Sequence, residues 1–300
     1  MQRTAPKRPK GNFHQTLAPL LFLTPNILIF LIFIIIPAVQ GLRMSFMKWS
    51  ILDTPKYIGL QNFEKLLRDK IFWITVKNTV VYSLATVLLL TVVSLLLALL
   101  LHKNDLRGEK AFRSMLYIPS LLSMITVGIA WRFIFGDEMG VVNYLIRSFG
   151  GEGVGWLTTR GHAMPSVIFV SVWAQAGYYM IIMISGLQAI PGELYEAAYI
   201  DGASTRRVFF SVTLPLLKST VLVVLVLSTI ASFKAYELIN VMTGGGPGYA
   251  TKFIVQQVYQ AAFVEDRMGY ASAMSIVLML IIGVFTLLQF RLSGKEQDYE

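Results

Sequence analysis

Charged side chains gather in one short segment of this apolar chain, residues 191–217, with the sequence PGELYEAAYIDGASTRRVFFSVTLPLL. The carboxylates of Glu193 and Glu196 stand three residues apart, and the guanidinium groups of Arg206 and Arg207 follow. On a helix, such side chains can pair with complementary groups on a partner protein or with phospholipid headgroups. The chemistry they offer is recognition, so the segment is either an amphipathic helix at a membrane surface or a docking element.

Residue types that support catalysis are absent or isolated. The chain has no cysteine, which excludes disulfides, thiolate metal sites and cysteine nucleophiles. Its histidines, His14, His102 and His162, are far apart in the sequence and do not suggest a ligand set. No phosphate-binding loop is present, because Gly294 and Lys295 lack the upstream glycine and the glycine-rich TGGGPGYAT has no lysine. We expect no catalytic residue, no metal and no cofactor in this chain.

Six long apolar stretches must position these polar residues. Hydrophobic residues make up 55% of the chain and charged ones only 14%, against ~25% charged in soluble domains. Each stretch reaches the roughly 20 residues that a helix needs to cross a bilayer, and none alternates as a barrel strand does. Because lipid cannot satisfy free backbone groups, we expect an all-α, polytopic membrane protein with six transmembrane helices. The stretches are residues 17–39, 76–101, 114–135, 165–187, 216–238 and 269–290.

Basic residues near the ends of these stretches indicate the orientation. The short loop HKNDLRGEKAFR after the second stretch is rich in Lys and Arg, as cytoplasmic loops are. With six spans, both termini and residues 191–214 then lie on the cytoplasmic side of the cell membrane. The first stretch follows a basic tail but is longer than a signal-peptide core, so we interpret it as a retained span. The net charge of +9 favours membrane lipid rather than nucleic acid, because the basic residues flank the spans.

This pattern divides the chain into three parts. Residues 1–74 hold the basic tail, the first span and an outer loop, in which GLQNFEKLLRDKIFW is typical of an amphipathic surface helix. Residues 75–292 hold the other five spans, and residues 293–300 form a second cytoplasmic tail. Two further loops, residues 136–163 and 240–268, are expected on the outer side.

The local pattern of residues 191–214 predicts two short helices around a glycine turn. Pro191 suits the first turn of a helix, and the glutamates that follow complement its positive end. Gly202 can take the positive φ that ends a helix, and Ser204 can cap the next one.

The spacing of this segment resembles a known signature. Three residues separate Glu196-Ala197-Ala198 from Gly202, nine separate Gly202 from Val212, and one separates Val212 from Leu214-Pro215. This pattern is similar to the EAA motif of permease subunits in binding-protein-dependent ATP-binding-cassette (ABC) importers, in which the aliphatic position is usually isoleucine. Its place between the fourth and fifth of six spans agrees with that family.

Two further segments resemble the carbohydrate-uptake branch of the family, of the maltose-permease type. They are YELINVMTGGGPGYAT, residues 236–251, and GLQNFEKLLRDKIFWITVKNTVVYS, residues 59–83. The similarity covers nearly the whole chain. The family usually has Phe-Asp where this chain has Tyr236 and Glu237, a difference that bears on substrate choice.

The resemblance implies a type I importer permease with a cytoplasmic coupling helix in residues 191–214. It implies ATPase coupling through Glu196, Ala197, Ala198, Gly202, Leu214 and Pro215. The implied partners are a second homologous permease subunit, two cytoplasmic ABC ATPase subunits and an extracytoplasmic solute-binding protein. ATP hydrolysis on the ATPase pair would drive alternating access of the spans to a sugar or sugar derivative, so this chain would be a transport subunit and not an enzyme.

Polar residues inside the spans are candidates for the translocation path. In the fifth span, Lys234 and Glu237 stand three residues apart and form either an ion pair or part of a polar path. The full set of path candidates is Gln175, Tyr178 and Tyr179 in the fourth span, with Tyr236, Glu237 and Asn240 around the end of the fifth. Aromatic faces, amides and carboxylates suit a sugar, but the same residues also join helices to one another. Arg132, near a span end, is expected to extend its side chain to the outer surface.

Two other classes of membrane protein would show different sequence features. An ion-coupled secondary transporter calls for a carboxylate at mid-membrane and internal inverted repeats, and Glu237 is the only candidate carboxylate. A non-transporting membrane scaffold would not require the polar residues of the fourth and fifth spans.

Overall fold

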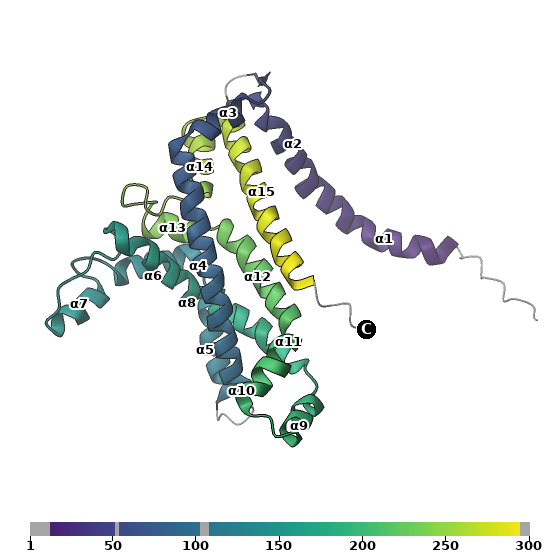
Figure 1. Cartoon of the computed structure of the whole chain (residues 1–300). Helices are drawn as coiled ribbons and strands as arrows, with labels where there is room; N and C mark the ends of the chain where they lie inside the picture. The colour runs from purple at the N-terminus through teal and green to yellow at the C-terminus, as the bar shows by residue number, and fades with distance from the viewer. Residues whose placement is uncertain (1–12, 52–53, 103–107, 295–300) are drawn as a thin grey trace, which may run out of the picture.

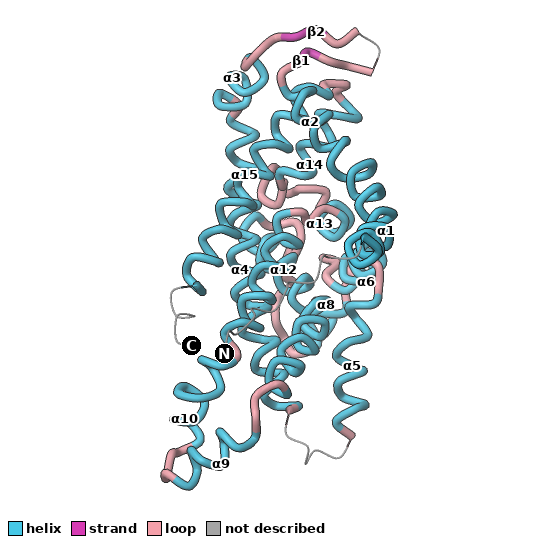
Figure 2. Tube along the Cα trace, turned by 90° about the vertical axis from the view of Figure 1, so that its right-hand side faces the viewer, coloured by secondary structure: helices cyan, strands magenta, loops and turns pink. Residues whose placement is uncertain are grey.

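The computed structural model describes residues 13–51, 54–102 and 108–294 of the chain. Within these ranges the backbone is helical apart from turns, loops and one hairpin, in which β1 (Met47–Lys48) runs antiparallel to β2 (Lys56–Tyr57). The helices form an elongated bundle (Figures 1 and 2). The expected all-α architecture is therefore confirmed.

Four helical runs among the described residues are long and apolar enough to cross a membrane. The number rises to six if each of two bent helix pairs counts as one span. The first run, Leu21–Ser45, comprises most of α1 (Phe13–Phe30), the π-helical η1 (Leu31–Ile35) and α2 (Ile36–Ser45). The other three are single helices, α4 (Lys70–Leu101), α8 (Arg160–Gln188) and α15 (Met268–Ser293).

The third apolar stretch is broken, although the sequence predicted a continuous helix. The helices α5 (Glu109–Leu121) and α6 (Met124–Ile134) meet at 97°. Pro119 has no backbone N–H to donate in the last turn of α5. Two residues past α5, the Ser123 side chain accepts a hydrogen bond from Ile125 N and caps α6. The chain therefore starts a new helix in a new direction.

The fifth apolar stretch bends and ends earlier than expected. The run Thr205–Leu216 contains α10 (Thr205–Val208), the π-helical η2 (Phe209–Thr213) and α11 (Leu214–Leu216), and it meets α12 (Lys218–Phe233) at 63°. Proline at the start of α11 supplies no backbone donor there. Beyond Phe233 the helix stops, and α13 (Glu237–Met242) is a separate element. Lys234 therefore follows the end of α12 and Glu237 begins α13, so the two residues do not lie together in the fifth span as predicted.

Close packing between α4, α5, α8 and α12 forms the centre of the bundle. The hydroxyl groups of Tyr82 on α4 and Ser171 on α8 lie 2.7 Å apart, and both side chains are buried. Gly177 lets α5 approach α8, because a Cβ at that position would overlap the carbonyl oxygen of Leu116. These contacts make the α4–α8 pair the fixed frame of the fold.

Polar elements lie at the two opposite ends of the bundle (Figure 1). The β1–β2 hairpin, α3 (Gln61–Arg68) and the start of α15 form one end. The helix α3 covers only part of the surface helix predicted in residues 59–73, because the chain breaks at Asp69 and α4 begins at Lys70. The other end carries α9 (Gly192–Ile200) and α10. The remaining elements are α7 (Val141–Ser148), beyond α6, and α14 (Ile254–Tyr259) with the π-helical η3 (Gln260–Val264), beside α15.

The first span stands apart from the rest of the bundle. It contacts the bundle mainly where α2 packs on α15, and α1 leads away from the other helices (Figure 1). None of its most apolar window is buried. A large apolar surface is thus left uncovered, as in a chain that meets lipid or another membrane subunit.

Candidate functional site

The segment after α8 forms a helical elbow, which we define as α9, the turn at Gly202 and α10. Gly202 adopts φ +72°, and Gly202 N and Ala203 N donate to Tyr199 O and Ala198 O, both at 3.0 Å. These two bonds satisfy the free carbonyls at the end of α9 in the pattern that requires a left-handed residue. Ser204 then caps α10 by accepting a hydrogen bond from Arg207 N at 3.4 Å. The predicted helix, glycine turn and second helix are all present.

Every side chain of α9 is at least partly exposed. Within the described part of the chain, no hydrogen bond or ion pair involves the carboxylate of Glu193 or Glu196. Ile200 is 86% exposed, and Tyr199 53%. Pro191 precedes the helix as its N-cap and is not in the first turn as predicted. A helix that offers free carboxylates and apolar side chains together is suited to a protein partner.

One side-chain contact ties α9 back to the span. Tyr195 Oη lies 3.3 Å from Thr213 Oγ1 of η2, and Thr213 is buried. Leu214 and Pro215 lie directly beyond it in α11, next to Leu217, which is fully buried in the core. The six motif residues therefore occupy two places: four lie in the elbow, and Leu214 and Pro215 lie where the elbow joins the fifth span.

The candidates around α13 form a second group, joined by residues that the sequence did not single out. The rings of Tyr236 and Tyr259 lie 5.6 Å apart, and Gln256 Nε2 lies 3.5 Å from Asn240 Oδ1. Glu237 is exposed in the first turn of α13, where its charge complements the helix dipole. The aromatic pair, the amides and one carboxylate are the groups that recognise sugar hydroxyls and ring faces.

Tyr259 and Gln256 reach this group because the chain folds back after α13. The sequence predicted residues 240–268 to be an outer loop, but α14 packs against α4 and α15, and Ile254 is 1% exposed. Ile254 N donates to Thr79 Oγ1 at 3.0 Å, which seats α14 on α4. Lys252 lies just before α14, donates to Gln260 Oε1 at 2.6 Å, and has its pKa lowered by burial. The segment is therefore part of the helical wall and not only a loop.

The candidates on α8 are separate from this group. Tyr179 is 3% exposed and packs in the core, whereas Tyr178 is 43% exposed with its ring 5.1 Å from that of Tyr179. Gln175 donates to Ser171 O within its own helix at 3.2 Å. Among the described residues, no hydrogen bond or ring contact links these side chains to Tyr236. Tyr179 is thus placed for helix packing, and Tyr178 is the more accessible of the pair.

The charged side chains near the ends of the spans do not form the ion pair that the sequence allowed. No ion pair between Lys234 and Glu237 occurs in the described structure, and both side chains are exposed. Arg132, at the end of α6, reaches Val241 O of α13 at 3.5 Å. No group of three or more His, Cys, Asp or Glu residues that could hold a metal lies within the described ranges.

Comparison with known proteins places these features in context. Residues 92–296 match the family described as "Binding-protein-dependent transport system inner membrane component". The chain is 35% identical to "Probable ABC transporter permease protein YurN" of Bacillus subtilis (strain 168), over 93% of this chain and 97% of that protein. It is 36% identical to "sn-glycerol-3-phosphate transport system permease protein UgpA" of Brucella abortus biovar 1 (strain 9-941), over 97% and 99% of the two chains. With "Arabinooligosaccharides transport system permease protein AraP" of Bacillus subtilis (strain 168) the identity is 34%, over 92% and 88%.

The fold is similar to a solved importer. A chain of the "Crystal structure of bacterial alginate ABC transporter in complex with alginate pentasaccharide-bound periplasmic protein" superposes with a TM-score of 0.84 and 26% identity. The match covers 97% of this chain and 99% of the other.

Proposed function

The chain belongs to the binding-protein-dependent transport system inner membrane component family, as a multi-pass permease subunit and not an enzyme, and from this premise we propose what it carries and how it is driven. It imports a sugar or sugar derivative across the cell membrane. The energy comes from ATP hydrolysed on partner subunits, and the spans alternate between inward-open and outward-open states. Relatives named for glycerol phosphate, arabinooligosaccharides and alginate support this substrate class.

The observation that carries the proposal is the uncovered elbow at one end of a membrane bundle. Its helix α9 exposes the carboxylates of Glu193 and Glu196 and two large apolar side chains, with no covering element within the described chain. An ATPase subunit covers this surface on the cytoplasmic side, with Glu196 facing basic or backbone N–H groups. Ala197 and Ala198 let the partner approach closely, and Gly202 sets the turn of the elbow.

The elbow transmits movement because it is continuous with the fifth span. When the ATPase pair closes on ATP, α9 moves with it, and the run through Leu214 and Pro215 carries that movement into α12. Arg206 and Arg207 at the elbow meet either the ATPase or anionic lipid headgroups.

The solute passes the group formed by Tyr236, Glu237, Asn240, Gln256 and Tyr259. The two aromatic rings stack on sugar faces. The amides of Asn240 and Gln256 donate hydrogen bonds to sugar hydroxyls and accept them from these groups, and the carboxylate of Glu237 accepts them. Gln175 and Tyr178 on α8 line a second part of the path.

The other partners follow from the surfaces that remain. A second, homologous permease subunit and membrane lipid cover the exposed first span. An extracytoplasmic solute-binding protein delivers the solute at the end opposite the elbow. Both termini lie in the cytoplasm, residues 75–292 form the transport domain, and nucleic acid is not a partner.

Solute uptake by the reconstituted transporter tests the proposal. Membrane vesicles that contain the complete complex should accumulate labelled sugar only with ATP inside and binding protein outside. Glu196→Ala should weaken association with the ATPase and reduce uptake more than Glu193→Ala does. Glu193 is a matched control because it is an exposed glutamate on the same helix. Uptake driven by a proton or sodium gradient without ATP would instead identify an ion-coupled transporter. Equal behaviour of the two variants would contradict the role of Glu196.

A further inference from the structure

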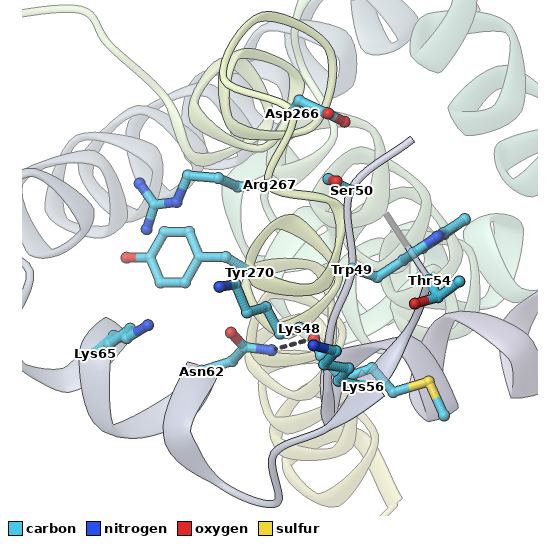
Figure 3. A pocket seen from close by; sticks show the side chains of 11 residues that line it. Lys48, Trp49, Ser50, Thr54, Lys56, Asn62, Lys65, Asp266, Arg267 and Tyr270 are labelled. Carbon is cyan, nitrogen blue, oxygen red and sulfur yellow. Dashed lines mark hydrogen bonds between the residues drawn. The ribbon is translucent and has the colours of Figure 1, made fainter. Parts of the chain in front are cut away.

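A basic pocket lies at the end of the bundle opposite the elbow. Its volume is about 230 Å³, and it lies between the β1–β2 hairpin, α3 and the start of α15. Figure 3 shows the side chains of Lys48, Lys65 and Arg267 around the ring of Tyr270. We call this site, with Lys56 and Asn62 also in its lining, the outer basic pocket. The pocket has room for several water molecules or for a hydrated carboxylate side chain.

The walls of the pocket are held in place by buried polar contacts. Asn62 Nδ2 donates to Ser45 O and Met47 O, both at 2.9 Å, and Asn62 is 5% exposed. Gly269 is needed where α15 passes the hairpin, because a Cβ there would overlap Met47 O. Asp266 Oδ1 accepts a hydrogen bond from Ile51 N at 2.7 Å. A ligand therefore meets a preformed site.

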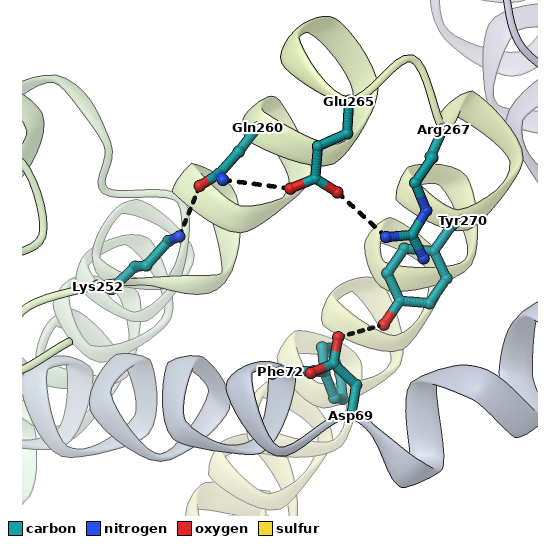
Figure 4. A network of polar contacts seen from close by, with 7 residues as sticks. All are labelled: Asp69, Phe72, Lys252, Gln260, Glu265, Arg267 and Tyr270. Carbon is teal, nitrogen blue, oxygen red and sulfur yellow. Dashed lines mark hydrogen bonds and ion pairs between the residues drawn. The ribbon is translucent and has the colours of Figure 1, made fainter.

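A second set of contacts holds the ring of Tyr270, the tyrosine that lines the pocket (Figure 4). Tyr270 Oη donates to Asp69 Oδ2 at 2.7 Å, and Asp69 Oδ1 caps the start of α4. The guanidinium group of Arg267 stacks 4.3 Å from the Tyr270 ring centre and pairs with Glu265 at 3.1 Å. Arg267 and Asp266 are thus already engaged within the protein.

The lysines of the pocket have no such partners. In the described structure, no hydrogen bond or ion pair involves the ammonium group of Lys48, Lys56 or Lys65, and all three side chains are exposed. Among the described residues of the lining, Asp266 is the one that is acidic. Like charges gathered in a shaped recess repel one another and create a positive potential that attracts an anion.

We propose that the outer basic pocket receives a carboxylate side chain from the extracytoplasmic solute-binding protein. This inference rests on the proposed function, which puts the elbow in the cytoplasm. The β1–β2 hairpin and α3, which line the pocket, lie at the end of the bundle opposite α9 and α10 (Figure 2), and hence on the outer side. A binding protein must seat on that surface before it releases solute, and the related importer was solved with its periplasmic protein bound. A rigid basic recess fixes the register of that docking by charge complementarity.

The test compares lysines inside and beside the pocket. The double variant Lys48→Gln/Lys65→Gln removes two pocket charges, and Lys70→Gln removes an exposed charge at the nearby start of α4, outside the lining. Binding of fluorescent solute-binding protein to the complete transporter in nanodiscs is measured at low and high salt. The double variant should bind roughly 3- to 30-fold more weakly at low salt, with a smaller salt dependence than the wild type. Lys70→Gln should bind nearly as the wild type does.

Three results would overturn the proposal. An equal loss in Lys70→Gln would indicate diffuse surface attraction, and an unchanged affinity in the double variant would exclude the pocket. Lysine-dependent binding of free glucuronate, with docking unchanged, would make the pocket a small-anion site. ATPase activity stimulated by the binding protein separates these results from failure of the proposed function: if the wild type shows no stimulation, the function itself is wrong.

Discussion

Gly202→Ala tests the elbow directly, because the chain offers a matched control in the same segment. A Cβ added at Gly202 or at Gly192 would meet no atom within 4 Å, so neither substitution causes a clash. The two positions differ in backbone conformation: Gly202 has φ +72°, whereas Gly192 is not among the residues with positive φ. Any difference between the two alanine variants therefore reports on the left-handed turn.

The size of the effect follows from that conformation. An L-residue in the left-handed region costs about 1–2 kcal/mol, and asparagine is tolerated better there than alanine. If docking requires the turn as it stands, the competent population falls by about 5- to 30-fold and the apparent Kd for the ATPase rises by the same factor. Gly202→Asn should lose less, and Gly192→Ala should be neutral or slightly favourable because alanine is the better helix former.

The assay is binding of the purified ATPase subunit to the permease in nanodiscs, followed by solute uptake. The melting temperature of the membrane bundle should stay the same in every variant, since α9 buries no residue. Equal ATPase affinity in Gly202→Ala and Gly192→Ala would refute the reasoning. So would a greater loss in Gly202→Asn than in Gly202→Ala.

Three further predictions concern the outer basic pocket, the α4–α8 frame and the path. Asn62→Ala removes two hydrogen bonds and leaves carbonyls unpaired, so it should lower the unfolding free energy by about 2–3 kcal/mol, measured by thermal unfolding in detergent. Tyr82→Phe should lower it by about 1 kcal/mol, and adding Ser171→Ala should cost little more, because the lost bond joins those two hydroxyls; additive losses would contradict this. Tyr236→Leu should reduce uptake about 2- to 10-fold by removing an aromatic face, with ATPase binding unchanged, whereas an equal loss of ATPase binding would indicate misfolding.

The helices could be located from the sequence, but their bends could not. Long apolar runs identify spans because lipid leaves no alternative to an internally bonded helix. Pro119 and Pro215 do not predict a bend by themselves, because a proline inside a span is often tolerated. Whether the chain bends depends on the interactions that stabilise the segment after the proline. At the first bend Ser123 caps α6, and at the second Leu217 is buried in the core.

The elbow could be predicted from local sequence, whereas the group around α13 could not. The elbow was predictable because its structure depends on near neighbours: Gly202 ends one helix and Ser204 caps the next. Tyr259 and Gln256 were missed because α14 is seated by Thr79, a contact across 175 residues of sequence. Polar side chains also make this segment look like a loop in a hydropathy profile. Propensity and hydropathy describe local preference, and only packing brings distant segments together.

The positions of the two sites constrain how they communicate. One continuous stretch, residues 205–242, runs from the elbow through the bend at Leu217 and along α12 to Tyr236 and α13. Because α12 packs against the α4–α8 pair in the centre of the bundle, the movement that we propose for the elbow would pass along the fifth span into that frame. Binding linkage is reciprocal. Consider a substitution in the elbow that weakens ATPase docking only when solute is bound. By this reciprocity it must weaken solute binding by the same factor when the ATPase is bound.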